Sequence, residues 1–140
     1  MENEEKRVVL DTNVLLTSIS PRSSNHWLWQ AILSGKFLLF VTTDILDEYA
    51  EIIEKHMGQT VSEAVLDLLT DLPNVHFIHK YYWWHLIEAD PDDNKFLDCA
   101  IAASAEILVS EDNHFKEIKK FPYFGLKWVK LEEFRKIVRG

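Results

Sequence analysis

Short apolar runs alternate with amphipathic segments along this chain of 140 residues. Short runs rich in apolar or β-branched residues, which are typical of strands, occupy residues 7–10, 37–41, 75–78, 107–110 and 126–129. The run at 37–41 is apolar throughout and is typical of a strand that is buried on both faces. Apolar residues at helical spacing predict helices at residues 24–33, from Asp44 onward, and at 62–72, 93–105 and 131–138. Because crossovers between parallel strands are normally helical, the alternation predicts an α/β fold with three α/β/α layers around a parallel sheet of about five strands.

Two local signals place helix ends within this pattern. Asp44 precedes an apolar stripe that includes Ile45 and Tyr49, so we expect its side chain to serve as the N-cap. Gly35 follows the helix at 24–33 and is the expected C-cap, because glycine adopts a left-handed backbone at low cost.

Composition narrows the class of protein. With 47% apolar and 27% charged residues, the chain is an ordinary globular sequence, and we expect one domain over residues 1–140. The longest apolar runs fall far short of the roughly 20 residues that a membrane helix requires. The acidic start, residues 1–5 (MENEE), is the opposite of a signal peptide, so we expect a cytoplasmic protein. Cys99 is the single cysteine, and its apolar neighbours predict a core position.

The formal net charge of −8 argues at first against a nucleic-acid partner, because such proteins usually present a basic surface. The charges are unevenly distributed, however. Residues 116–140 hold eight of the fifteen Lys and Arg and only three acids. This segment is either the solvated face of a helix or a phosphate-facing rim beside an acidic centre.

Acidic residues recur where the predicted strands end. Asp11 directly follows the first strand, and Asp112 follows the fourth. Glu48 lies one turn into the helix after the second strand, and the segment 90–94 (DPDDN), which contains Asp93, opens the helix that leads to the fourth. In open parallel sheets, ligands bind outside the carboxyl ends of the strands. We therefore expect these carboxylates to meet at one edge of the sheet.

A cluster of carboxylates is unstable unless some of them stay protonated or a cation lies among them. Two unit charges about 4 Å apart repel by roughly 4 kcal/mol at an effective dielectric constant near 20. Oxygen ligands alone favour Mg²⁺ or Mn²⁺ over Zn²⁺. Structural alternatives stay open for each residue: Asp11 and Asp112 suit helix caps or turns, Glu48 suits a solvated helix, and Asp98 suits an exposed helix position.

The residues that carry this pattern resemble the PIN-domain family of metal-dependent ribonucleases, which includes toxins of toxin-antitoxin pairs. The resemblance runs from residue 8 to about 134 and rests on residues 9–14 (VLDTNV), 48–49 (EY), 90–100 (DPDDNKFLDCA) and 108–112 (LVSED). It implies catalytic and metal-binding roles for Asp11, Glu48, Asp93 and Asp112, a further ligand at Asp98, and supporting roles for Asn13 and Ser110. Asp92 is adjacent to Asp93 and is the alternative for the third ligand.

The resemblance implies hydrolysis of RNA phosphodiester bonds with one or two Mg²⁺ or Mn²⁺ ions, which activate water and support the leaving oxygen. We expect single-stranded RNA as substrate, with Lys116, Lys119 and Lys120 on flanking phosphates, and an antitoxin and a second copy of the chain as protein partners. A phosphohydrolase with an aspartyl-phosphate intermediate needs a second aspartate two residues after the first, where this chain has Asn13.

The alternative hypothesis is a noncatalytic protein with the same fold. In it, the chain acts by binding a protein or RNA, and tryptophans such as Trp27 and Trp29 contribute to an interface. Such a module has no reason to keep mutually repelling carboxylates together, and the acidic set therefore favours catalysis.

Overall fold

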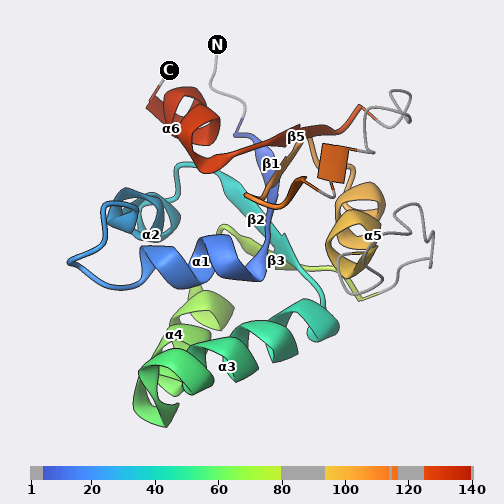
Figure 1. Cartoon of the computed structure of the whole chain (residues 1–140). Helices are drawn as coiled ribbons and strands as arrows, with labels where there is room; N and C mark the ends of the chain where they lie inside the picture. The colour runs from blue at the N-terminus through green and yellow to red at the C-terminus, as the bar shows by residue number, and fades with distance from the viewer. Residues whose placement is uncertain (1–4, 80–93, 114, 117–124, 140) are drawn as a thin grey trace.

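The computed structural model describes residues 5–79, 94–113, 115–116 and 125–139. The strands are β1 (Arg7–Leu10), β2 (Leu38–Val41), β3 (Val75–Phe77), β4 (Ile107–Val109) and β5 (Lys127–Val129). The helices are α1 (Thr12–Ser18), α2 (His26–Leu33), α3 (Thr43–Met57), α4 (Gln59–Asp71), α5 (Asn94–Ala102) and α6 (Leu131–Arg139). Figure 1 shows how they surround the sheet.

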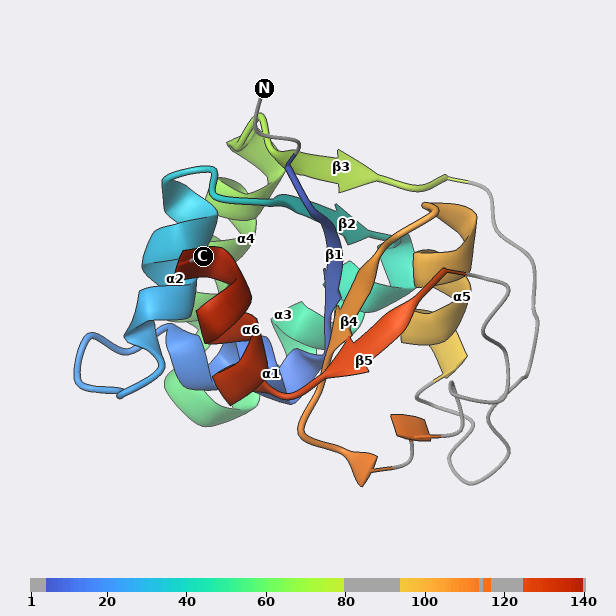
Figure 2. The same ribbon diagram turned by 90° about the horizontal axis from the view of Figure 1, so that it is seen from above.

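All strand pairs in the five-stranded sheet are parallel, in the order β3-β2-β1-β4-β5. Figure 2 shows α5 on one side of the sheet and α1, α2, α4 and α6 on the other. This arrangement confirms the predicted α/β/α layers. The chain leaves β1 toward β2 and later returns to place β4 on the other side of β1. The strand order therefore reverses between β1 and β4, the place where open sheets of this kind bind ligands.

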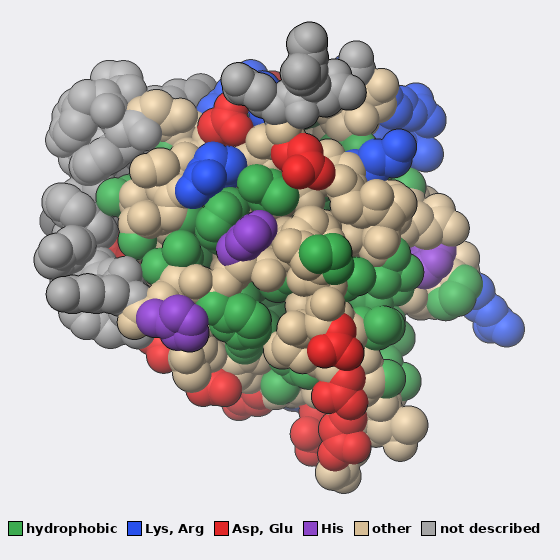
Figure 3. Space-filling view, turned by 180° about the vertical axis from the view of Figure 1, so that it is seen from behind, with side chains coloured by type: hydrophobic (Ala, Val, Ile, Leu, Met, Phe, Trp, Pro, Cys, Tyr) green, Lys and Arg blue, Asp and Glu red, His purple; other side chains and the backbone are tan. Residues whose placement is uncertain are grey.

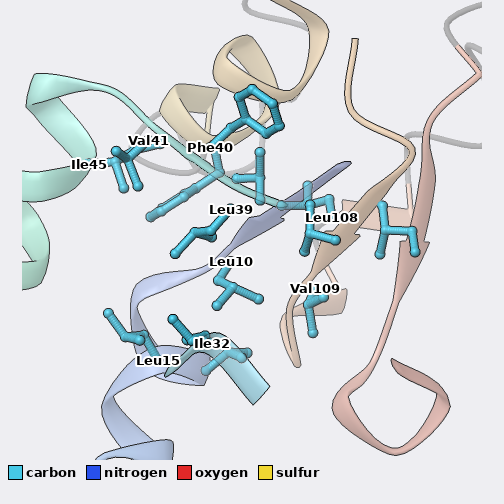
Figure 4. Close-up of a cluster of buried hydrophobic side chains, with 14 of the residues drawn as sticks. Leu10, Leu15, Ile32, Leu39, Phe40, Val41, Ile45, Leu108 and Val109 are labelled. Atoms are coloured by element: carbon cyan, nitrogen blue, oxygen red, sulfur yellow. The ribbon is translucent and has the colours of Figure 1, made fainter. Parts of the chain in front are cut away.

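The core is built from strands that are apolar on both faces. Leu10, Leu39 and Leu108 lie on the three central strands and have no solvent exposure. Figure 4 shows them between side chains from flanking elements, among them Leu15 of α1 and Ile45 of α3. Burial of each such side chain contributes about 1.5–3 kcal/mol. The packed strands therefore fix the positions of the residues that directly follow β1 and β4.

The structure differs from the predicted bounds in several helices: α4 begins at Gln59 rather than at residue 62, and α2 begins at His26 rather than at residue 24. α1 was not predicted, because three β-branched residues in TNVLLTS give it a low helix propensity, and burial of Val14 and Leu15 stabilises it instead. Thr42 rather than Asp44 is the N-cap of α3, since its hydroxyl accepts a hydrogen bond from the Ile45 N–H at 3.2 Å. α5 ends at Ala102 rather than at residue 105, because Ser104 adopts a φ of 54° and turns the chain into β4.

Other sequence expectations are confirmed. Gly35 has a φ of 72°, a conformation that favours glycine, although the C-cap of α2 is Ser34 and Gly35 is the residue after it. Cys99 is fully buried in α5, and burial together with the charge of Asp98 raises the pKa of its thiol to about 12. Among the helices that the structure describes, none is both long and apolar enough to cross a membrane.

Candidate active site

Asp11 and Asp112 are joined through one hydroxyl at the place where the strand order reverses. Ser110, directly after β4, donates from Oγ to Asp11 Oδ2 at 2.7 Å, and the same Oγ accepts from the Asp112 backbone N–H at 2.9 Å. The Asp11 N–H in turn donates to the Val109 carbonyl at 3.0 Å. Ser110 has no solvent exposure, so its hydroxyl holds the two acidic segments in a fixed relation.

The carboxylate of Asp11 pays a desolvation penalty, because the residue is only 7% exposed. Burial raises its pKa above the ordinary 3.8, and the negative charge of Glu48 raises it further. The hydrogen bond from Ser110 and nearby backbone N–H groups of Thr12 and Asn13 lower it in part. The net shift is upward, so the folded chain disfavours the negative charge on Asp11. A cation bound there would relieve that cost.

Glu48 reaches the site from α3, which contacts both α1 and α5. The Thr12 hydroxyl donates to Glu48 Oε2, and the Lys95 ammonium contacts Glu48 Oε1, each at 2.5 Å. The side chains of Glu48 and Lys95 are 27% and 20% exposed, so this ion pair is largely shielded from water. Glu48 is therefore not a solvated helix residue, which was the alternative interpretation of this position.

Tyr49 supports the base of the site. Its hydroxyl donates to the carbonyl of Leu10 at 2.6 Å, one residue before Asp11. The pKa of Tyr49 lies well above its usual 10.0, chiefly because the side chain is fully buried, with smaller effects of Cys99, Asp11 and Glu48. The phenol therefore stays neutral and fastens α3 to the end of β1.

Sequence reasoning did not assign roles to Thr12, Tyr49 or Lys95 in positioning the acids. All three residues lie inside the motifs that carry the family resemblance, and this was the available signal. Tyr49 also belongs to the apolar stripe of α3, so it looks like an ordinary core residue in the sequence. Only the structure pairs it with a backbone carbonyl at the site.

The remaining predicted residues divide by location. Asp98 lies in α5 at 1% exposure, which excludes an exposed helix position for it. Asn13 is exposed on α1 and lines a pocket beside the acidic site. Lys116 is exposed shortly after Asp112. The positions of Asp92, Asp93, Lys119 and Lys120 lie outside the described residues.

Glu111 lies between Ser110 and Asp112 and has a structural role. Its Oε2 accepts a hydrogen bond from the backbone N–H of Leu131, the first residue of α6, at 2.7 Å. A carboxylate at a helix N-terminus satisfies an N–H without an intrahelical partner and interacts favourably with the helix dipole. Glu111 therefore ties α6 to the loop that carries Asp112.

The donors at this edge are carboxylate oxygens, the ligands that Mg²⁺ and Mn²⁺ prefer. Asp11 is the donor that most needs a cation, since the fold raises its pKa. Within the described ranges, no group of three or more acidic, His or Cys side chains is close enough together to hold a metal. Asp11, Glu48 and Asp112 have the donor type that a divalent ion prefers, although the described side chains do not by themselves form a group of three that could hold one. Asp93, which the sequence adds to them, lies outside the described residues.

Comparison with known proteins agrees with the sequence and the fold. The family model described as PIN domain matches residues 7–114, most of the chain, and the chain belongs to the PIN-domain family. PIN domains are generally nucleases that use divalent metal ions, and membership supports hydrolase activity. No curated protein matches the chain.

Solved structures with the same fold are distant in sequence. VapBC2 from Rickettsia felis, bound to a DNA fragment from its promoter, aligns with a TM-score of 0.60 and 20% identity over 89% of this chain and 98% of that chain. VapBC-1 from nontypeable Haemophilus influenzae aligns with a TM-score of 0.60 and 16% identity over 90% and 98%. The PIN domain endonuclease Utp24 aligns with a TM-score of 0.52 and 14% identity over 89% and 84%. At these identities the likeness shows the fold.

Proposed function

We propose that this protein is a metal-dependent endoribonuclease that hydrolyses phosphodiester bonds in single-stranded RNA, and that it is the toxin of a toxin-antitoxin pair. The observation that carries the proposal is Asp11, a buried carboxylate with a raised pKa at the reversal of strand order. A fold that only had to be stable would gain from an uncharged residue at this position. Retaining a costly charge at the place where such sheets bind ligands points to a role in chemistry.

Asp11, Glu48, Asp93 and Asp112 would hold Mg²⁺ or Mn²⁺, with Asp98 as a further ligand. The ion would activate a water molecule and neutralise the charge that develops on the phosphate.

The neighbouring residues position these acids. Ser110 orients the Asp11 carboxylate through its hydroxyl, and Asn13 follows Asp11 at the start of α1. Thr12 and Lys95 hold the two oxygens of Glu48. Because the fold fixes these groups before substrate arrives, little reorganisation is needed at the moment of reaction.

The partners follow from the family and from the neighbours. The two VapBC structures are toxin-antitoxin complexes, which supports an antitoxin as protein partner of this chain. A homodimer, a cytoplasmic location, and phosphate contacts by Lys116, Lys119 and Lys120 belong to the same proposal.

Cleavage of single-stranded RNA by the purified protein tests the function. The assay compares Mg²⁺, Mn²⁺ and excess chelator for the wild type, Asp11→Asn and Asp67→Asn. Asp67 is an exposed acid on α4, so its replacement makes the same change in charge outside the candidate site. We expect metal-dependent cleavage by the wild type and Asp67→Asn, and its loss in Asp11→Asn. Equal cleavage by all three proteins would contradict the proposal.

A further inference from the structure

Two pockets share Trp27 and Arg135 beside the acidic site. The first has a volume of about 550 Å³ and is lined by Asn13 and Glu111, which adjoin the site, and by Trp27 and Arg135 among others. The second, of about 280 Å³, shares Trp27 and Arg135 with the first and is also lined by Lys36 and Arg139. The pockets therefore form a path that leads away from Asp11 along α2 and α6.

The path is held in place by packing between α2 and α6. The ring centroids of Trp27 and Phe134 lie 6.3 Å apart, and the guanidinium carbon of Arg135 lies 5.5 Å from the centroid of the Trp27 ring. Phe134 also packs edge-on against Phe37, with centroids 5.1 Å apart. Trp27 is partly exposed, so its indole presents an aromatic surface in a fixed position.

The charges differ between the two ends of the path. Near the acidic site, Glu111 and Glu132 line the first pocket together with the amides of Asn13 and Asn25. Carboxylates repel a phosphate, but they accept hydrogen bonds from the amino groups of bases. The second pocket has three exposed cations and no acid in its lining, which suits a phosphate.

Figure 3 shows the molecule from behind, where acidic side chains gather at the bottom, over α3 and α4, and basic side chains lie at the upper right. The three cations of the second pocket attract a polyanion to the neighbouring parts of α2 and α6.

We propose that these pockets bind an unpaired stretch of the RNA substrate next to the cleavage site. A base stacks against Trp27 or Arg135 in the first pocket, where Asn13 and Asn25 offer hydrogen bonds to its edge. A neighbouring phosphate lies among Lys36, Arg135 and Arg139 in the second. This inference rests on the proposed function: the two pockets would bind the RNA that the acidic site cleaves.

Binding of a short fluorescent single-stranded RNA, measured by anisotropy in excess chelator, tests the base pocket without cleavage. Trp27→Leu should weaken binding about tenfold or more, because stacking on an aromatic side chain contributes strongly for each base. Trp27→Phe should keep most of the affinity and the packing against Phe134. An abasic RNA of equal length should bind to the wild type and to Trp27→Leu with the same affinity.

A charge-matched pair of double variants tests the phosphate pocket. Lys36→Gln with Arg139→Gln should weaken binding and reduce the slope of log K against log salt by about 0.7 for each phosphate that is no longer neutralised. Lys55→Gln with Lys136→Gln removes the same charge from exposed positions outside both pockets, and it should bind nearly as the wild type does.

The outcomes separate this inference from the proposed function. Equal losses in the two double variants, or unchanged binding by both Trp27→Leu and Trp27→Phe, would overturn the path and would leave metal-dependent cleavage standing. Absence of cleavage in the metal assay, with binding that depends on Trp27 and Lys36, would overturn the nuclease function and retain the RNA path. If a protein partner occupies the path instead, none of these variants should change the affinity for RNA.

Discussion

The acidic edge and the Trp27 path lie side by side but are built in opposite ways. At the edge, Asp11, Tyr49 and Ser110 are buried, and hydrogen bonds fix their polar atoms. Along the path, the cations are exposed on helix ends and loops. Hydrolysis requires groups held in a set geometry, whereas a phosphate backbone requires only positive charge within reach. The difference indicates that reaction and binding can be altered separately.

The strongest test of this separation is Asp11→Asn. The neutral amide retains the shape of the side chain but loses the charge that would hold a metal. We expect cleavage to fall by more than about 100-fold, since loss of an outer hydrogen-bond partner of a metal ligand already costs roughly 10–100-fold. RNA binding in chelator should be unchanged or stronger, because one negative charge has been removed. Cleavage kinetics and anisotropy on the same preparation measure both effects.

Ser110→Ala should have the next largest effect. It removes the hydroxyl that donates to Asp11 and accepts from Asp112, so both acidic segments lose their common partner. We expect a loss of roughly 10–100-fold in activity, with a pH profile displaced upward because the pKa of Asp11 rises further. Ser110→Thr is the matched control, since it keeps the hydroxyl. Equal activity of the alanine and threonine variants would show that the bridge does not position Asp11.

The pair between Lys95 and Glu48 should contribute less. Both side chains are partly shielded, so their coupling should exceed that of an exposed pair and reach about 1 kcal/mol. Urea unfolding of Lys95→Gln, Glu48→Gln and the double variant measures this coupling in a double-mutant cycle. Additive losses would mean that Lys95 does not hold Glu48. The ion pair between Lys127 and Glu133, which is exposed, provides a reference that should show weaker coupling.

The pH dependence of stability should be the smallest effect and has a defined sign. Because the pKa of Asp11 is raised on folding, its contribution to stability is fully present below pH 3.8 and is lost as the pH rises through the folded pKa. Asp11→Asn should therefore unfold at higher urea than the wild type at neutral pH in chelator, and the difference should shrink at low pH. Added Mn²⁺ should stabilise the wild type and leave the variant unchanged. A less stable variant at neutral pH would contradict the raised pKa.

The strands were predictable because each contains a short run rich in apolar residues. β1 has the predicted bounds, and the other four strands lie within the predicted segments. In the central strands, burial on both faces leaves little choice of residue, whereas the edge strands β3 and β5 each have one buried residue. α1 was not predictable from its residues, because packing of Val14 and Leu15 overrides a weak local propensity. The N-cap of α3 was assigned to Asp44 because two polar residues of capping type lie close together, and only the backbone conformation at Thr42 distinguishes them.

Sequence alone determined that acidic residues follow the strands, because a residue's place after an apolar run is a local property. It also identified the PIN-domain family, because an ordered set of motifs can be recognised without knowing which residues contact one another. Only the tertiary structure decided that one serine joins Asp11 to Asp112, that Lys95 lies on Glu48, and that Trp27 meets Arg135 across two helices. These pairs are distant along the chain, and their contact depends on how the layers pack rather than on any local pattern.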